Sequence, residues 1–186
     1  VHRDVSPQNI YFTLEGNVLL LDFGLGRTTG QTVTREGIIK GKVPYMSPEQ
    51  VEGRGIDARS DIFSLGIVAW ESITVRRLFR KSTDILTLAA VTQGSIPSLR
   101  DVAPSTPGAL ADVVHKALER DQNKRFQSAA EFLRALRAAT PDLDEPGQVI
   151  LQRTLTWAFP EHRSSPEAGT IRDTSLDELF ALDSDV

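Results

Sequence analysis

The eight-residue stretch HRDVSPQN, at residues 2–9, decides how the rest of the sequence is interpreted. Two short apolar runs follow it directly, residues 10–13 and 18–21, and a turn containing Gly16 and Asn17 separates them. Glycine and asparagine tolerate the positive φ angles of tight turns, so runs of this kind on either side of them are typical of paired strands. The pattern therefore predicts a β-hairpin directly after residues 2–9.

Two further triplets follow in order. Asp22-Phe23-Gly24 comes directly after the second predicted strand, and Ser47-Pro48-Glu49 ends a long segment rich in Gly, Thr and charged residues. Each triplet alone would be common by chance. Their order, the hairpin and the long loop, together with His2-Arg3-Asp4 and Asn9, make the chain resemble the eukaryotic-like serine/threonine protein kinases of bacteria. The resemblance covers residues 1 to about 140.

The resemblance implies a site for phosphoryl transfer, which requires a positioned acceptor hydroxyl and cations that balance the charge of the phosphates. Asp4 matches the carboxylate that orients the hydroxyl and accepts its proton, and Arg3 matches the arginine that faces a phosphorylated residue of the activation segment. Asn9 and Asp22 match the oxygen ligands of magnesium. Tyr11 stands where the family often has an aliphatic residue at the floor of the adenine pocket, and its ring can still form an apolar floor. The implied cofactors are therefore ATP and Mg²⁺.

The activation segment offers several threonines as sites of regulatory phosphorylation. Thr32 and Thr34 lie about where related bacterial kinases are modified, and Thr28 and Thr29 are further candidates. A phosphate at one of them would pair with Arg3 and order the segment. Threonines also suit a solvated loop, and the sequence leaves both explanations open.

Other residues that match the family are implied to be structural: His2, Phe23, Glu49, Asp61 and Arg125. Glu49 and Arg125 match an ion pair that ties the end of the activation segment to the later helices. Asp61 matches the acid at a helix start that holds the backbone of the catalytic loop.

The chain departs from the family pattern at two positions near the catalytic carboxylate. The family usually has lysine at the position of Ser6, and its serine/threonine branch usually has threonine at the position of Lys42. In the family both side chains approach the same carboxylate. Our hypothesis is that Lys42 supplies the positive charge near Asp4 that Ser6 cannot supply, since lysine acts as a flexible point charge. The alternative is that Lys42 is a solvated loop residue like Lys40.

Two central helices are predicted from apolar patterning. Ser60 is expected to cap a helix over residues 61–70, which is apolar on most faces and should therefore be buried. Another helix is expected over residues 85–92.

Two later helices are predicted from their start signals. Thr106 as a cap and Pro107 at the first helical position predict a helix that continues over residues 109–118. Ser128 and Glu131 match a capping box ahead of a further amphipathic helix.

Composition is that of an ordinary globular protein, with 40% hydrophobic and 25% charged residues in 186. The chain has no cysteine, no apolar run long enough to span a bilayer and no basic excess that would suggest nucleic acid, so we expect a cytoplasmic protein. A domain boundary is predicted near residue 140. Residues 141–186 contain 3 Lys and Arg against 10 Asp and Glu, so they are expected to form an acidic, disordered tail.

The expected fold is α+β and mainly helical: the C-terminal lobe of a protein kinase, with a short β-hairpin that carries the site. The expected function is that of a partial serine/threonine kinase acting on protein substrates. The family's Gly-rich loop, its strand lysine and the glutamate that pairs with this lysine have no match in the sequence. The site would thus need further N-lobe sequence or an activating partner. The alternative function is a catalytically inactive remnant that acts as a protein-binding or regulatory module.

Overall fold

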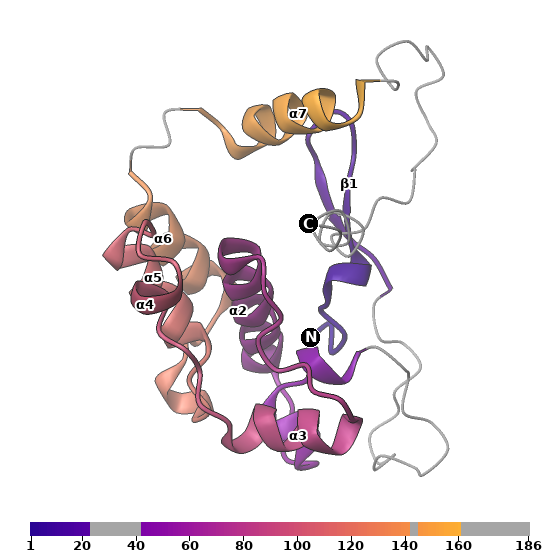
Figure 1. Cartoon of the computed structure of the whole chain (residues 1–186), viewed down its shortest axis with the longest axis vertical. Helices are drawn as coiled ribbons and strands as arrows, with labels where there is room; N and C mark the ends of the chain where they lie inside the picture. Colours follow the sequence, from indigo (N-terminus) through magenta and orange to yellow (C-terminus); the bar gives the residue numbers. More distant parts are fainter. Residues whose placement is uncertain (23–41, 142–144, 161–186) are drawn as a thin grey trace. The chain divides into compact units, whose positions relative to one another are not determined.

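The computed structural model describes residues 1–22, 42–141 and 145–160 of the chain (Figure 1). It divides into two compact units, one with Val1–Ser6 and Asp22–Thr140, the other with Pro7–Leu21 and Pro141–Val186. The predicted α+β, mainly helical class is confirmed, because the described elements are helices and 3-10 turns with a single two-stranded sheet. None of the helices in these residues is long and apolar enough to cross a bilayer.

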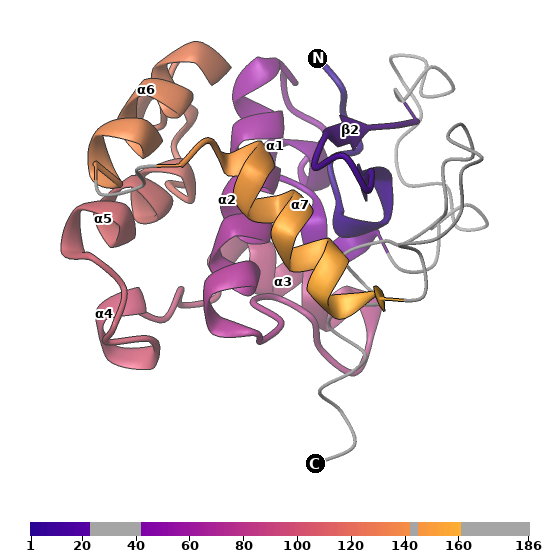
Figure 2. The same cartoon turned by 90° about the horizontal axis from the view of Figure 1, so that it is seen from above.

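Helix α2, Ala58–Thr74, is the centre of the first unit, as predicted for the segment that is apolar on most faces (Figure 2). Phe63 and Ile67 are fully buried and Trp70 nearly so. Side chains of Ile62, Ala117, Phe126 and Phe132 form one cluster of the core. Helix α2 packs against three later helices: α4 (Leu99–Val102), α5 (Gly108–Ala117) and α6 (Ala129–Ala139).

The predicted cap of α2 is wrong. The helix begins at Ala58, and the carboxylate of Asp57 accepts a hydrogen bond from the Arg59 N–H at 2.8 Å. Aspartate and serine cap helices about equally well, so local sequence does not choose between Asp57 and Ser60. Ser60 is buried inside the helix instead, where its hydroxyl donates to Glu49.

The segments before and after α2 form short elements. The 3-10 turn η2, Val43–Tyr45, is followed by the one-turn helix α1, Pro48–Val51. The predicted helix over residues 85–92 is confirmed as α3, Asp84–Gln93, which packs against both. A further 3-10 turn, η3, covers Gln122–Lys124.

The starts of α5 and α6 were predicted with different success. Pro107 occupies the cap of α5, one residue later than the predicted cap Thr106, and no side chain caps this end. Ser128 caps α6 as predicted, accepting from the Glu131 N–H at 3.1 Å. The Glu131 carboxylate accepts from the Gln127 N–H at 2.7 Å, one residue before the cap.

The second unit contains the predicted hairpin. After the 3-10 turn η1, Pro7–Asn9, strand β1, Ile10–Phe12, pairs with β2, Val18–Leu20, in antiparallel register, with Tyr11 opposite Leu19. Gly16 in the turn has φ of +80°, as the turn chemistry predicts.

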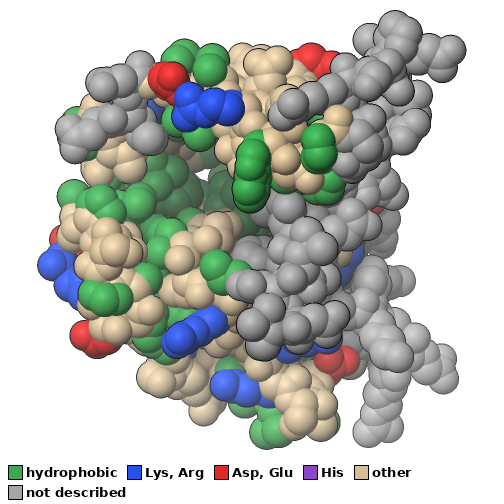
Figure 3. Space-filling model, turned by 45° about the horizontal axis from the view of Figure 1, so that its top comes forward, with side chains coloured by type: hydrophobic (Ala, Val, Ile, Leu, Met, Phe, Trp, Pro, Cys, Tyr) green, Lys and Arg blue, Asp and Glu red, His purple; other side chains and the backbone are tan. Residues whose placement is uncertain are grey.

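Part of the predicted tail is helical in the same unit, which differs from the expectation of disorder for those residues. Residues Gly147–Ala158 form helix α7, whose Gln148 donates to the Glu15 carbonyl at 3.2 Å in the hairpin turn. A Cβ added at Gly16 would lie 2.1 Å from the Gln148 carbonyl oxygen, so only glycine permits this approach. Trp157 of α7 is 79% exposed, and other hydrophobic side chains reach the surface of the molecule (green in Figure 3).

Candidate active site

Asp4 and Lys42 form an ion pair, 38 residues apart in the chain. The Lys42 Nζ donates to the Asp4 Oδ2 at 2.6 Å, and both side chains remain partly accessible, at 21% and 15% exposure. A carboxylate with an adjacent cation at an accessible position can receive a proton from a hydroxyl and bind an anionic group next to it.

The backbone that carries Asp4 is anchored to α2. The Asp61 carboxylate, in the first turn of α2, accepts from the His2 N–H and from the Arg3 N–H, both at 2.7 Å. Arg3 has φ of +68°, an uncommon conformation for a residue other than glycine. Hydrogen bonds from a rigid helix are the means by which such a strained conformation is held.

Gln50 of α1 makes a second contact with this backbone, which sequence reasoning did not anticipate. Its side-chain Nε2 donates to the Arg3 carbonyl at 2.9 Å, and its Oε1 accepts from the Ser47 N–H at 2.9 Å. The only local signal is that glutamine stands three residues after serine, as in a capping box.

A cluster around Glu71 supports the segment that follows Lys42. The Tyr45 hydroxyl donates to Glu71 at 2.7 Å, and the Leu78 N–H donates to its other oxygen at 2.8 Å. Arg77 also hydrogen bonds to Glu71 and to the Tyr45 hydroxyl. Glu71 is 1% exposed, so these donors satisfy a carboxylate that water cannot reach. The Tyr45 N–H in turn donates to the Lys42 carbonyl at 3.1 Å.

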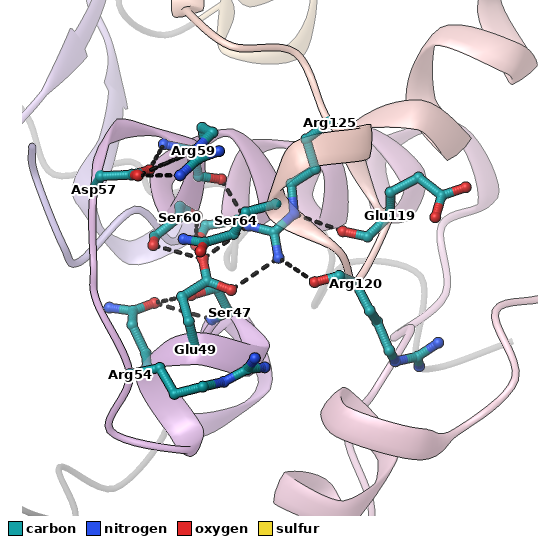
Figure 4. Close-up of polar contacts among 12 residues, drawn as sticks. Ser47, Glu49, Arg54, Asp57, Arg59, Ser60, Ser64, Glu119, Arg120 and Arg125 are labelled. Atoms are coloured by element: carbon teal, nitrogen blue, oxygen red, sulfur yellow. Dashed lines mark hydrogen bonds and ion pairs between the residues drawn. The ribbon is translucent and has the colours of Figure 1, made fainter.

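Glu49 and Arg125 form a fully buried bidentate ion pair (Figure 4), with both distances at 2.8 Å. The remaining N–H groups of Arg125 donate to the carbonyls of Arg59, Glu119 and Arg120, so all five of its donors have acceptors. The guanidinium carbon also lies 4.7 Å from the ring centroid of Phe63. The pair thus joins α1 to α2 and to the chain ahead of α6.

Burial alone would raise the pKa of Glu49. The hydrogen bonds from Arg125 and Ser60, with the charge of Arg125, outweigh that effect and lower the pKa to about 2. Glu49 is therefore ionised at any physiological pH.

The predicted nucleotide and magnesium residues lie in different units. Asn9, 2% exposed, and Tyr11 belong to the hairpin unit, and Asp22, with φ of +56°, belongs to the first unit. Asn9 and Asp22 both present oxygen ligands, which suit a hard cation such as Mg²⁺. Among the described residues, no group of three or more His, Cys, Asp or Glu could hold a metal ion by itself. Phe23 and the four candidate threonines, Thr28, Thr29, Thr32 and Thr34, lie outside the described residues, as does Lys40.

Ser6 cannot supply the positive charge that the lysine at this position supplies in the family. Its side chain is fully buried, and its hydroxyl has no hydrogen-bond partner among the described residues. Within this part of the chain, the ammonium group bound to Asp4 comes from Lys42.

The comparison with protein families decides the identity. The profile of the protein kinase domain matches residues 1–135. The chain belongs to the protein kinase family. The pair of Asp4 and Lys42, the contacts of Asp61 and the pair of Glu49 and Arg125 all lie within the matched residues.

Bacterial kinases are similar to this kinase chain over most of its length. The tyrosine-protein kinase MasK of Myxococcus xanthus is 38% identical over 165 residues, which are 88% of this chain and 26% of MasK. The DNA damage-responsive serine/threonine-protein kinase RqkA of Deinococcus radiodurans is 35% identical, over 98% of this chain and 27% of RqkA. The serine/threonine-protein kinase PknB of Mycolicibacterium smegmatis is 38% identical, over 71% of this chain and 22% of PknB. The kinase chain thus spans about a quarter of the length of these relatives.

A solved structure supports the fold. The twitchin kinase region of C. elegans superimposes with a TM-score of 0.59 over 98% of this chain and 28% of that chain, at 22% sequence identity. The mostly helical architecture with one hairpin is therefore that of a kinase C-terminal lobe.

Proposed function

We propose that the chain is the catalytic-loop half of a protein kinase that transfers the γ-phosphate of ATP to serine or threonine hydroxyls of proteins. The observation that carries the proposal is the Asp4 carboxylate, which is bound to Lys42 at 2.6 Å on a loop whose backbone is anchored to α2. This combination provides a base at a defined place and a positive charge next to it.

In this proposal Asp4 accepts a hydrogen bond from the acceptor hydroxyl and orients its oxygen toward the γ-phosphorus. As the oxygen bonds to phosphorus and the bond to the leaving ADP oxygen breaks, the hydroxyl proton passes to the Asp4 carboxylate. Lys42 stabilises the negative charge that develops beside Asp4. Asn9 and Asp22 would hold Mg²⁺, which supplies charge neutralisation on the phosphates when bound with ATP.

Serine or threonine is the proposed acceptor because the stretch from residue 41 to 49 resembles that of serine/threonine kinases, and PknB and RqkA are named as such kinases. MasK is named as a tyrosine kinase, so the acceptor residue is the point to test.

The test is phosphate transfer by the product of the whole reading frame that contains these 186 residues, called the full-length kinase below. It is incubated with radiolabelled ATP, Mg²⁺ and a general protein substrate, and the labelled amino acids are separated after acid hydrolysis. We expect phosphoserine and phosphothreonine. Label in phosphotyrosine alone would overturn the proposed acceptor class, and no transfer under any condition would favour the inactive binding module.

A further inference from the structure

The amide of Gln50 has a defined orientation, because its two neighbours permit only one. The Ser47 N–H can only donate, so the atom it contacts must be the side-chain oxygen of Gln50, at 2.9 Å. The Arg3 carbonyl can only accept, so the atom it contacts must be the side-chain nitrogen, also at 2.9 Å. The Ser47 hydroxyl adds a third contact to the Gln50 oxygen at 3.1 Å.

The Arg3 carbonyl belongs to the peptide bond that leads into Asp4. Arg3 is therefore held on both sides: Asp61 binds its N–H at 2.7 Å, and Gln50 binds its carbonyl at 2.9 Å. Its φ of +68° is a conformation that a free chain would leave. A change at the carbonyl would rotate the peptide plane and with it the direction in which the Asp4 side chain leaves the backbone.

Gln50 lies next to the buried Glu49, which Arg125 fixes in α1. The Lys42 ammonium thus contacts the Asp4 carboxylate, and the Gln50 amide contacts the peptide that precedes Asp4. We propose that Gln50 is a positioning residue for Asp4, which makes catalytic geometry depend on whether α1 is in place. This inference rests on the proposed kinase function.

The test replaces Gln50 by glutamate in the full-length kinase. Gln50→Glu keeps the shape and the acceptor for the Ser47 N–H, but it places a second oxygen against the Arg3 carbonyl, where the amide donated. A small displacement of a catalytic group lowers rate far more than it lowers substrate affinity. We expect kcat for phosphate transfer to fall at least about tenfold, with KM for ATP changed by less than about twofold.

Two control variants separate positioning from folding. Gln122→Glu makes the same chemical change outside the candidate site, at an amide that donates to the Gly55 carbonyl at 3.3 Å. This variant should leave kcat unchanged. Ser47→Ala removes a contact to the Gln50 oxygen but leaves the amide donor, and should lower kcat much less than Gln50→Glu.

The outcomes are read together with melting temperatures of the variants. A tenfold loss of kcat in Gln50→Glu, with a melting temperature close to that of wild type, supports the proposal. Wild-type kcat in Gln50→Glu overturns it while the kinase function stands. The proposal is also overturned if Gln50→Glu and Ser47→Ala lower the melting temperature equally and lower kcat equally. That result would indicate a purely structural role for Gln50. An inactive wild-type kinase would instead overturn the proposed function on which the inference rests.

Discussion

Asp4→Asn in the full-length kinase is expected to lower kcat for phosphate transfer about a thousandfold. Asparagine has nearly the shape of aspartate, so the loop should keep its place through the Asp61 and Gln50 contacts to Arg3. It carries no charge and cannot accept the hydroxyl proton, and it also removes the charged partner of Lys42. The measurement is the steady-state rate at saturating ATP.

The matched control is Asp112→Asn, the same change at an exposed carboxylate that pairs with Arg100. It should transfer phosphate at the wild-type rate. If Asp4→Asn retained more than about a tenth of the wild-type kcat, proton transfer to Asp4 would contribute too little to be its role.

Arg125→Met is expected to lower the free energy of unfolding by about 3–5 kcal/mol. Most of this loss comes from the Glu49 carboxylate, which would remain buried without a cation beside it. The lost attraction of the ion pair itself contributes less. The free energy is measured by urea denaturation of the full-length kinase. Arg100→Met, which breaks an exposed pair with Asp112, should lower it by less than about 1 kcal/mol.

A double variant tests this cause. Glu49→Met with Arg125→Met removes both charges, and apolar side chains of similar volume should recover most of the loss. If Arg125→Met alone had the same free energy of unfolding as the wild type, the buried Glu49 carboxylate would not need Arg125 for its stabilisation. That result would contradict the role inferred from the buried ion pair.

The same pair predicts how stability responds to acid. The folded pKa of Glu49 is about 2, below the ordinary value of 4.5, so its contribution is fully present above pH 4.5. That contribution, about 3 kcal/mol, is lost as the pH falls from 4.5 toward 2. Arg125→Met should lose this part of the acid dependence.

The parts of the site that could be predicted are those with a family motif or a local signal. The hairpin follows from two short apolar runs on either side of a turn with Gly16 and Asn17, and strands β1 and β2 lie within those runs. The pair of Glu49 and Arg125, 76 residues apart, came from the family resemblance and not from any periodicity. The same holds for Asp61 and the backbone of the catalytic loop.

Other features have no signal that a single sequence carries. Gln50 and Arg3 are 47 residues apart. The Gln50 amide binds a backbone carbonyl, which every residue type has, so the identity of residue 3 gives no signal of the contact. The cluster of Tyr45, Glu71 and Arg77 depends on how α2 ends and where the next segment turns. Helix α7 was missed because its neighbours are rich in proline, glycine and acids, although Leu155 of this helix is buried.

The structure also sharpens the hypothesis about the displaced cation. Lys42 contacts Asp4 at 2.6 Å, and the buried Ser6 hydroxyl has no partner among the described residues. The contact is present, and its catalytic role remains a prediction. Lysine suits the role because its single charge sits at the end of a flexible stem and can follow both the carboxylate and a phosphate oxygen.

Lys42 is the cation on which the proposed site depends, and the most direct measurement compares kcat of Lys42→Ala and Lys40→Ala in the full-length kinase. Both changes remove one lysine from the same segment, two residues apart. We expect Lys42→Ala to lower kcat about 100-fold and Lys40→Ala to change it by less than about twofold. Equal effects of the two substitutions would contradict the proposed role of Lys42, because the charge beside Asp4 would then be no more important than the charge of Lys40.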